Sequence, residues 1–332
     1  MVEEGLTLVK HYRQTAFMGF WEVLQNLGTI RHLLRGCKKD LLSHRPDVLI
    51  LVDYPGFNLR MAKFAHQHGI RVFYFISPKV WAWNQKRAKK IKKYVDRMFS
   101  ILPFEEAFYQ KYDYNIDYVG NPLYDAYREF APSESFEEAY PLLKEKPLIA
   151  LLPGSRQMEL QTSLPRLTPL SKRFPEYQFV VAGVESLPEY LYAPAKEAGI
   201  PVVYEQTYEL LHRAEAAVVT SGTATLETAL FDVPQVVVYY ANPITVWLAR
   251  QFIKVRFISL VNLILDKEAV TELIQKDFTL ENVEQELQKL LKGGQKRQPV
   301  REDYARLREI LHTEGTAERT AALMYEDLKS VH

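Results

Sequence analysis

The chain has 332 residues, of which 42 are Lys or Arg, 41 are Asp or Glu and one is Cys. This length favours two domains over one, and the balanced charge argues against a nucleic-acid-binding protein, which carries a basic surplus. A single cysteine excludes an internal disulfide and a cysteine-rich metal site.

Two stretches of the sequence bear on the membrane. The opening MVEEGLTLVKHYR has no apolar core, so we expect no signal peptide. The most apolar run, residues 233–249, is short for a transmembrane helix and is interrupted by Pro234 and Pro243. We therefore expect a soluble protein of a reducing cytosol that meets a membrane only at its surface.

Strands and helices alternate over the first part of the chain. Residues 47–53 (DVLILVD) predict a buried strand that ends at a Pro-Gly turn, and residues 58–69 predict an amphipathic helix. The same alternation continues to about residue 125. Further strands are expected at residues 70–77, 97–103 and 116–122, with helices at residues 86–96 and 104–112.

A polar stretch with several prolines near residues 126–146 predicts a domain boundary. A second alternating series follows it, and the chain is mostly helical from about residue 281. The predicted strands of the second series are residues 148–154, 177–183, 201–206, 215–222 and 234–240.

The alternation indicates an α/β protein with parallel sheets covered on both faces. We expect two doubly wound, Rossmann-like domains at residues 1–125 and 146–280, with a cleft between them. The helices of residues 281–332 are expected to pack back toward the first domain. In such sheets ligands bind at the carboxyl ends of the strands, so a site is expected in the loops that follow those ends.

The first of two small-residue turns is LPGSRQ, at the end of the strand predicted over residues 148–154. Gly154 has no side chain, so the backbone can approach a ligand closely. Ser155 can cap the following helix, and Arg156 can donate paired hydrogen bonds to phosphate oxygens. Ordinary turn and cap chemistry is the alternative interpretation of this motif.

The second turn, TSGTATLE, has the same plan. Ser221, Gly222 and Thr223 stand at a helix start, where free amides and the helix dipole favour an anion. Glu227 follows one turn later on the side of Thr223, and a carboxylate there can accept hydrogen bonds from vicinal ribose hydroxyls. Two such turns at equivalent strand ends of one domain favour a nucleotide-sugar site over two unrelated caps.

The first domain offers less specific candidates. Asp53 ends a buried strand, where an acid is either solvated or a base, or an orienter of one, for an attacking hydroxyl. Trp81 and Trp83 follow the next strand. They can either line the bottom of a pocket or pack in a core. Residues 86–93 are strongly basic, which is typical of a solvated helix face and also of a surface for anionic lipid or a phosphorylated substrate.

An apolar segment, FMGFW, precedes the first amphipathic helix. One interpretation is a helix of the core; the other is a contact with acyl chains or with a membrane interface. The residues concerned are Phe17, Met18, Phe20 and Trp21.

Strings from nearly the whole chain resemble the lipid-A-disaccharide synthase family. FMGFWEVL, DYPGFN, SPKVWAWNQKR, LPFEEAFYQKY, VGNPLYD, LPGSR, SGTATLE and SLVNLIL occur in that family's order and spacing. The resemblance implies a GT-B glycosyltransferase without a metal or another cofactor. It would join UDP-2,3-diacylglucosamine to 2,3-diacylglucosamine 1-phosphate on the cytoplasmic face of a Gram-negative inner membrane, as a peripheral protein. A homodimer is compatible with the resemblance.

The resemblance also implies roles for individual residues. Asp53 and Arg156 resemble the family's essential aspartate and arginine, and Glu227 resembles the glutamate of its SGTAxLE string. Asn262 resembles the asparagine of the SLxN string and joins the nucleotide-sugar site. The implied acceptor and lipid site comprises Phe17, Met18, Phe20, Trp21, Asn58, Trp81, Trp83 and Asn121.

Two features depart from the family's pattern. Members open with a strand, a GEASGD loop, a helix and a second strand, so roughly 40–50 residues of the first domain are expected to be absent, which would leave apolar side chains and backbone groups of neighbouring strands uncovered. The absent loop carries a glutamate that rivals Asp53 as the base. Asn121 stands where many members have a histidine, and its amide can hydrogen-bond but cannot titrate.

Two alternative functions stay open. Another UDP-sugar enzyme of the GT-B fold, such as a UDP-GlcNAc epimerase, would use the same two turns but would not require FMGFWEVL or SPKVWAW. An inactive remnant that still binds UDP or membrane is the other alternative, and the absent opening favours it.

Overall fold

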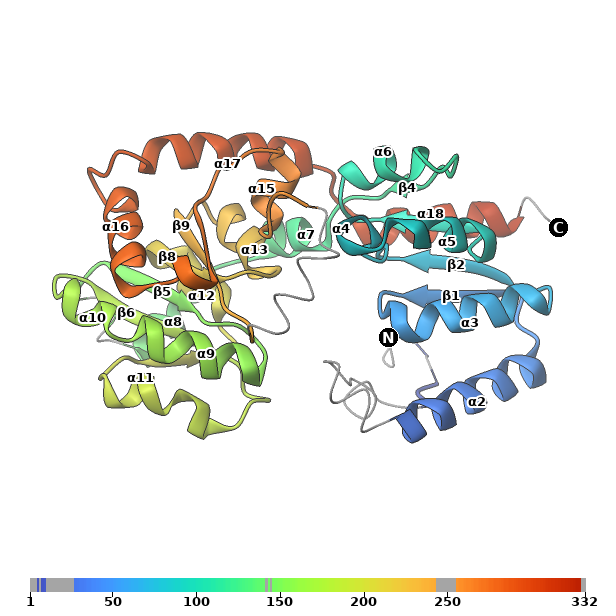
Figure 1. Cartoon of the computed structure of the whole chain (residues 1–332), viewed down its shortest axis with the longest axis horizontal. Helices are drawn as coiled ribbons and strands as arrows, with labels where there is room; N and C mark the ends of the chain where they lie inside the picture. Colours follow the sequence, from blue (N-terminus) through green and yellow to red (C-terminus); the bar gives the residue numbers. More distant parts are fainter. Residues whose placement is uncertain are drawn as a thin grey trace. The chain divides into compact units, whose positions relative to one another are not determined.

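The computed structural model describes residue 5 and residues 7–9, 27–140, 143, 145–242 and 255–329. The chain divides into two compact units, whose helices and strands are labelled in Figure 1. The first unit is residues 1–78 with 87–99, and the second is residues 79–86 with 100–332. Residues 100–125, which the sequence analysis assigns to the first domain, therefore group with the second unit.

A four-stranded sheet has the strand order β1-β2-β3-β4. β1 pairs with β2 and β2 pairs with β3, in both cases in parallel. The central strand β2 is buried at Val72, Phe73 and Tyr74, whereas the edge strand β1 exposes about half of the Ile50 and Val52 side chains (49% and 50%). The strands are β1 (Val48–Val52), β2 (Arg71–Phe75), β3 (Arg97–Ser100) and β4 (Asp117–Tyr118).

A second, fully parallel sheet has six strands in the order β10-β9-β8-β5-β6-β7. All five residues of its central strand β5 are buried, as is typical of a parallel strand covered by helices on both faces. The strands are β5 (Leu148–Leu152), β6 (Gln178–Gly183), β7 (Val202–Tyr204), β8 (Ala214–Thr220), β9 (Gln235–Tyr239) and β10 (Glu272–Ile274).

The helices alternate with these strands along the chain, as the sequence predicts. Those up to β5 are α2 (Leu27–His44), α3 (Pro55–Gln67), α4 (Val80–Trp83), α5 (Ala88–Tyr94), α6 (Phe104–Gln110), α7 (Pro122–Glu129) and α8 (Glu134–Ala139), with a 3-10 turn at Gln85–Arg87. Those between β5 and β9 are α9 (Gln157–Leu167), α10 (Leu170–Arg173), α11 (Ala193–Glu197), α12 (Thr207–Arg213) and α13 (Ala224–Leu230), with a 3-10 turn at Glu189–Tyr192. Those after β9 are α15 (Leu260–Leu265), α16 (Leu280–Leu290), α17 (Arg297–Leu311) and α18 (Thr316–Lys329), with a 3-10 turn at Gln275–Asp277.

The polar stretch near residues 126–146 is more ordered than its composition indicates. It contains α8, and its apolar residues Phe136 and Leu143 belong to the hydrophobic core of the second sheet. The guanidinium of Arg213 lies over the Phe136 ring at 4.8 Å, and Glu209 accepts a 2.7 Å hydrogen bond from the Ser133 amide. Apolar packing, a hydrogen bond and a cation–π contact together attach this stretch to the second unit.

Candidate functional site

The two predicted turns lie at the same edge of the second sheet. β5 and β8 are neighbouring parallel strands, with Leu152 opposite Val219. The turn that follows β5 and the turn that follows β8 are therefore adjacent, at the carboxyl ends where ligands bind in sheets of this kind. We call the turn at residues 153–156 the arginine turn and the turn at residues 221–223 the serine turn.

The arginine turn is held by a glutamate that the sequence analysis did not single out. Glu159, in the first turn of α9, accepts hydrogen bonds from the backbone amides of Ser155 (3.0 Å) and Arg156 (3.3 Å). Its other oxygen accepts a 3.1 Å hydrogen bond from Nη1 of Arg156. The Arg156 side chain remains 62% exposed, so most of its donors face solvent. The signal in the sequence is a carboxylate three residues after a helix cap.

Gly154 is required by this arrangement. Its φ of 113° lies in the region that favours glycine. A Cβ at this position would lie 2.5 Å from both Cβ and Oε2 of Glu159, closer than atoms can approach. The glycine thus lets the Glu159 carboxylate lie against the turn, which the sequence analysis had explained only as room for a ligand.

The serine turn is fixed to the strands and to the loop before α15. The Ser221 amide continues the β8–β9 ladder by donating to Val238 O at 3.0 Å. The Ser221 hydroxyl donates to Ile258 O at 2.9 Å, while Gly222 and Thr223 are exposed. The Thr225 amide donates the first backbone hydrogen bond of α13, to Gly222 O at 3.3 Å. The start of the helix therefore faces solvent, at the same sheet edge as the arginine turn.

Glu227 lies in α13 and is partly buried. Burial raises the pKa of its carboxyl, and a hydrogen bond from the Tyr208 hydroxyl acts in the opposite direction. Burial, followed by the Glu227 charge, also raises the pKa of Tyr208. The Tyr208 ring packs 4.9 Å from the Phe231 ring and 5.9 Å from the Phe130 ring, centroid to centroid. Tyr208, in the first turn of α12, was not predicted, because nothing local in its sequence points to α13.

Asn262 is fully buried and its side-chain amide is satisfied by the protein. Its Nδ2 donates to Val270 O (2.8 Å) and to Glu272 Oε1 (2.9 Å). Its Oδ1 accepts from the amides of Ala269 (2.8 Å) and Val270 (2.9 Å). Glu272 in turn accepts from the amide of Ile258, whose carbonyl receives the Ser221 hydroxyl. The structure therefore connects Asn262 to the serine turn through Glu272 and the loop before α15.

The carboxyl end of β9 borders the arginine turn. Burial raises the pKa of Tyr239, with smaller opposing effects from the charges of Glu159 and Arg156. The next residue, Tyr240, receives the Arg166 guanidinium over its ring at 4.0 Å. Tyr239 is thus close enough to the arginine turn to be affected by its charges, and Tyr240 contacts Arg166 of α9; the sequence analysis predicted neither.

Asp53, in the first unit, stands in a turn with unusual backbone angles. Asp53 and Tyr54 both have positive φ, 43° and 44°. The Asp53 carbonyl accepts hydrogen bonds from Asn58 Nδ2 (2.8 Å) and from the Tyr74 hydroxyl. The Asp53 carboxyl side chain is exposed. Left-handed backbone at a tyrosine costs about 1 kcal/mol or more, and such strain is concentrated at functional sites.

The remaining acceptor candidates fall into different environments. Trp81 is 6% exposed, and its Nε1 donates to the buried Glu105 at 2.8 Å; Trp83 is 42% exposed. Trp81 is thus a core residue, one of the two alternatives from the sequence. Asn121 is buried and caps α7 by accepting from the Leu123 amide at 3.0 Å, while its Nδ2 donates to Ile101 O. Phe17, Met18, Phe20 and Trp21 lie outside the described residues.

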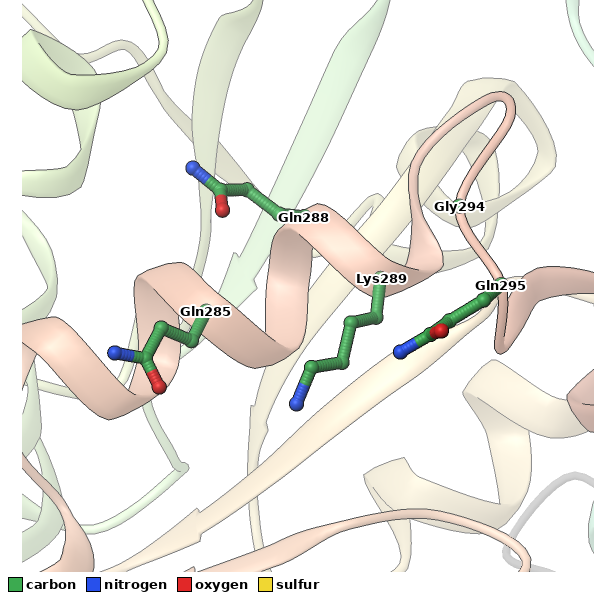
Figure 2. Close-up of a pocket in the computed structure, with 5 residues that line it drawn as sticks. All are labelled: Gln285, Gln288, Lys289, Gly294 and Gln295. Carbon is green, nitrogen blue, oxygen red and sulfur yellow. The ribbon is translucent and has the colours of Figure 1, made fainter.

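Other features of the described chain do not add a site. Within the described ranges no cluster of three or more His, Cys, Asp or Glu side chains could hold a metal ion. Among the described helices, none has the length and apolar character needed to cross a bilayer. A surface pocket beside α16 contains no residue of either turn (Figure 2). It is lined by Gln285, Gln288, Lys289, Gly294 and Gln295.

Solved structures share the fold at low sequence identity. UDP-GlcNAc 2-epimerase from Neisseria meningitidis, bound to UDP-GlcNAc, aligns with a TM-score of 0.63 at 12% identity and covers 95% of this chain and 83% of the epimerase. Sucrose-phosphate synthase from Thermosynechococcus elongatus aligns with a TM-score of 0.56 at 11% identity and covers 92% of this chain and 80% of the synthase. The predicted fold class, GT-B with two Rossmann-like sheets, is confirmed.

Sequence comparisons give the family. The family model described as lipid-A-disaccharide synthetase matches residues 1–326. Lipid-A-disaccharide synthase from Myxococcus xanthus (strain DK1622) is 37% identical over 333 residues, 98% of this chain and 87% of that protein. The synthase from Coxiella burnetii (strain Dugway 5J108-111) is 35% identical over 98% of this chain and 88% of its own. The chain belongs to the lipid-A-disaccharide synthase family, and it is a hexosyltransferase of lipid A biosynthesis.

Proposed function

We propose that the chain joins UDP-2,3-diacylglucosamine to 2,3-diacylglucosamine 1-phosphate by direct displacement. The 6-hydroxyl oxygen of the acceptor forms a bond to the anomeric carbon of the donor, and the bond from that carbon to the diphosphate breaks. UDP leaves, and the hydroxyl proton passes to a base. The single observation that supports this proposal best is the adjacency of the arginine turn and the serine turn at one sheet edge.

Arg156 is the proposed partner of the leaving diphosphate. The amides of Ser155 and Arg156 already donate to Glu159, so the guanidinium and the Ser155 hydroxyl are the donors that the arginine turn offers to a ligand. The helix start of the serine turn, at Gly222 and Thr223, would complete the anion site. Such preorganised donors stabilise the charge that develops on a leaving group.

Glu227 is the proposed partner of the ribose. Its carboxylate has a hydrogen bond from Tyr208, and two carboxylate oxygens leave further acceptor positions for the ribose hydroxyls. Asn262 would act on the same site indirectly, since its amide is used within the protein and supports the loop that binds Ser221.

Asp53 is the proposed base, or the residue that orients it, for the acceptor hydroxyl. Its turn is held from inside by Asn58 and Tyr74, so its backbone is fixed while its carboxylate faces solvent. The acceptor and its acyl chains would also contact Trp83 and the segment that contains Phe17, Met18, Phe20 and Trp21. Trp81 and Asn121 are buried, so their role would be indirect.

A division of labour between the two parts of the chain is also proposed. The region of residues 1–125 would hold the acceptor and lipid, and the region of residues 146–280 would hold the UDP-sugar. The helices of residues 281–332 would pack back toward the first region. Exposed lysines of α5 would draw the protein to an anionic membrane surface as a peripheral protein of the Gram-negative inner membrane. A homodimer is part of the same proposal.

The experiment that tests the reaction is a product assay on the 332-residue chain with both diacyl substrates in detergent. Formation of the disaccharide 1-phosphate together with UDP, in equal amounts, is the expected result. UDP binding without any disaccharide would overturn the proposed transfer and would favour a protein that only binds nucleotide. Interconversion of free UDP-GlcNAc without an acceptor would instead favour an epimerase.

A further inference from the structure

We propose that Glu159 is a positioning residue that presents the Arg156 guanidinium to the diphosphate of the donor. This inference rests on the proposed function, because it assigns a partner to the arginine of that same site. Three hydrogen bonds carry it. One Glu159 oxygen accepts from the amides of Ser155 (3.0 Å) and Arg156 (3.3 Å), and the other accepts from Arg156 Nη1 (3.1 Å).

The two ends of this contact differ in exposure. The Glu159 side chain is 17% exposed, whereas the Arg156 side chain is 62% exposed. The carboxylate therefore lies under the turn, and the guanidinium extends from it toward solvent. A free arginine side chain samples many rotamers, and each must be lost when a ligand binds. Glu159 restricts that freedom before the ligand arrives.

The contact leaves the arginine able to bind. A guanidinium has five N–H donors in a planar fork, and the Glu159 bond uses one of them at Nη1. The remaining N–H groups can still donate to phosphate oxygens in the paired geometry that arginine favours.

Gly154 shows that the turn is built around Glu159. With a φ of 113° and no Cβ, it leaves room for the Glu159 Cβ and Oε2, each 2.5 Å from where a Cβ would lie. An exposed ion pair between residues three apart on a helix needs no such accommodation and contributes little to stability. The arrangement is therefore better explained by control of the turn and of Arg156 than by a surface ion pair.

The same contacts also fit an opposite role for Glu159. That role predicts the opposite change in UDP affinity when the Glu159 charge is removed. The Glu159 carboxylate could occupy the place of a phosphate, so that the donor must displace it. Removal of its charge would then strengthen UDP binding. A positioning role instead predicts weaker binding, because the arginine is no longer held.

The test is UDP affinity, measured by calorimetry on the full chain for wild type, Glu159→Gln, Arg156→Ala and the double variant. Gln keeps the size of the side chain and an oxygen that can accept from the turn amides, but it loses the charged bond to Arg156. We expect Glu159→Gln to weaken UDP binding by about tenfold in the wild-type background and to have almost no effect in the Arg156→Ala background. Glu281→Gln, an exposed first-turn glutamate of α16, is the matched control and should not change UDP affinity.

The outcomes separate the inference from the proposed function. An equal loss in both backgrounds would mean that Glu159 acts on the fold rather than through Arg156, and tighter UDP binding by Glu159→Gln would mean that it competes with the ligand; either result overturns the inference alone. Wild-type protein that does not bind UDP would overturn the proposed function and the inference with it.

Discussion

The two sheets bury their strands to different extents. The edge strand β1 of the first sheet leaves Ile50 and Val52 about half exposed, whereas the edge strands of the second sheet, β7 and β10, are buried or partly buried at every position. The charge of the units also differs. Of the chain's 42 basic and 41 acidic residues, the first unit carries 16 and 7, which leaves 26 and 34 for the second.

This difference indicates different tasks. In the second unit, hydrogen bonds fix the residues of the candidate site. Glu159 accepts from Arg156, and Tyr208 donates to Glu227. Glu272 accepts from the loop that binds the Ser221 hydroxyl. The first unit is basic, and its edge strand β1 exposes Ile50 and Val52. Under the proposed function, the hydrogen-bonded side chains of the second unit suit a nucleotide-sugar, and the basic first unit suits an acceptor carried by a membrane.

The largest effect is expected at the strained turn of the first unit. Asp53→Asn preserves a residue that tolerates positive φ but removes the charge, so turnover should fall about 10²-fold or more if Asp53 is the base. Asp47→Asn, an exposed change just before the opposite end of β1, is the control and should leave turnover unchanged. Equal activity of the Asp53 variant and wild type would contradict the catalytic role proposed for Asp53, the base candidate of the first unit.

The basic character of the first unit is expected to control membrane binding. Replacing Lys89, Lys90 and Lys93 by Gln should weaken binding to vesicles that contain anionic lipid by about 10²-fold, since each lysine near such a surface contributes about 1 kcal/mol. The same change at the exposed Lys172, Lys276 and Lys292 of the second unit should have little effect. Similar losses for the two triple variants in a co-sedimentation assay would show that net charge alone is responsible.

The uncovered edge predicts a difference in local stability. Limited proteolysis of the native chain should cut residues 1–125 several-fold faster than residues 146–280, because an edge strand with exposed apolar side chains is less protected than β5. Mass spectrometry of the early fragments would locate the cuts. Equal resistance of the two regions would contradict the contrast between the sheets.

The smallest effect concerns the interior of the second unit. Three hydrogen bonds, from Lys289, Lys296 and Thr271, outweigh burial and lower the pKa of Glu286 from 4.5 to about 2. A lowered pKa in the folded state stabilises the protein above the unfolded pKa, and this contribution is lost as the pH falls from about 4.5 toward 2. Glu286→Gln should therefore reduce the free energy of unfolding by about 1 kcal/mol at pH 7, with the difference disappearing near pH 2.

A matched variant checks the pH effect. Glu284→Gln breaks only a contact at 3.8 Å with the half-exposed Arg173, so it should change the free energy of unfolding by less than about 0.5 kcal/mol. Chemical denaturation of both variants across the pH range would measure the difference. A loss for Glu286→Gln that did not depend on pH would point to packing instead of charge.

Much of this architecture could be predicted from the sequence, because it follows local patterns. Continuous apolar runs predicted β5, β6, β8 and β9, and the small-residue motifs predicted the turns that follow β5 and β8. The short strand β10 was missed, since Glu272–Ile274 is too brief and too polar for a periodicity. α8 was interpreted as part of a boundary, because its contacts with Arg213 and with the core of the second sheet cannot be read from its polar composition.

The details of the site depend on contacts between distant residues. Nothing near Tyr208 in the sequence indicates that its hydroxyl reaches Glu227 in another helix. Asn262 has the residue type of a ligand-binding amide, and only the structure shows that the protein uses all of its hydrogen-bonding capacity. The left-handed turn at Asp53 and Tyr54 was likewise invisible, since neither residue type requires positive φ.

The central claim is that the arginine turn serves sugar transfer, and the rate of disaccharide formation by Arg156→Ala tests it most directly. Arg173→Ala, a half-exposed arginine of the same unit, is the control and should retain the wild-type rate. We expect Arg156→Ala to form disaccharide about 10²-fold more slowly, the scale of losing one preorganised charge donor, with an unchanged melting temperature. A folded Arg156→Ala protein that forms disaccharide at the wild-type rate would contradict the account.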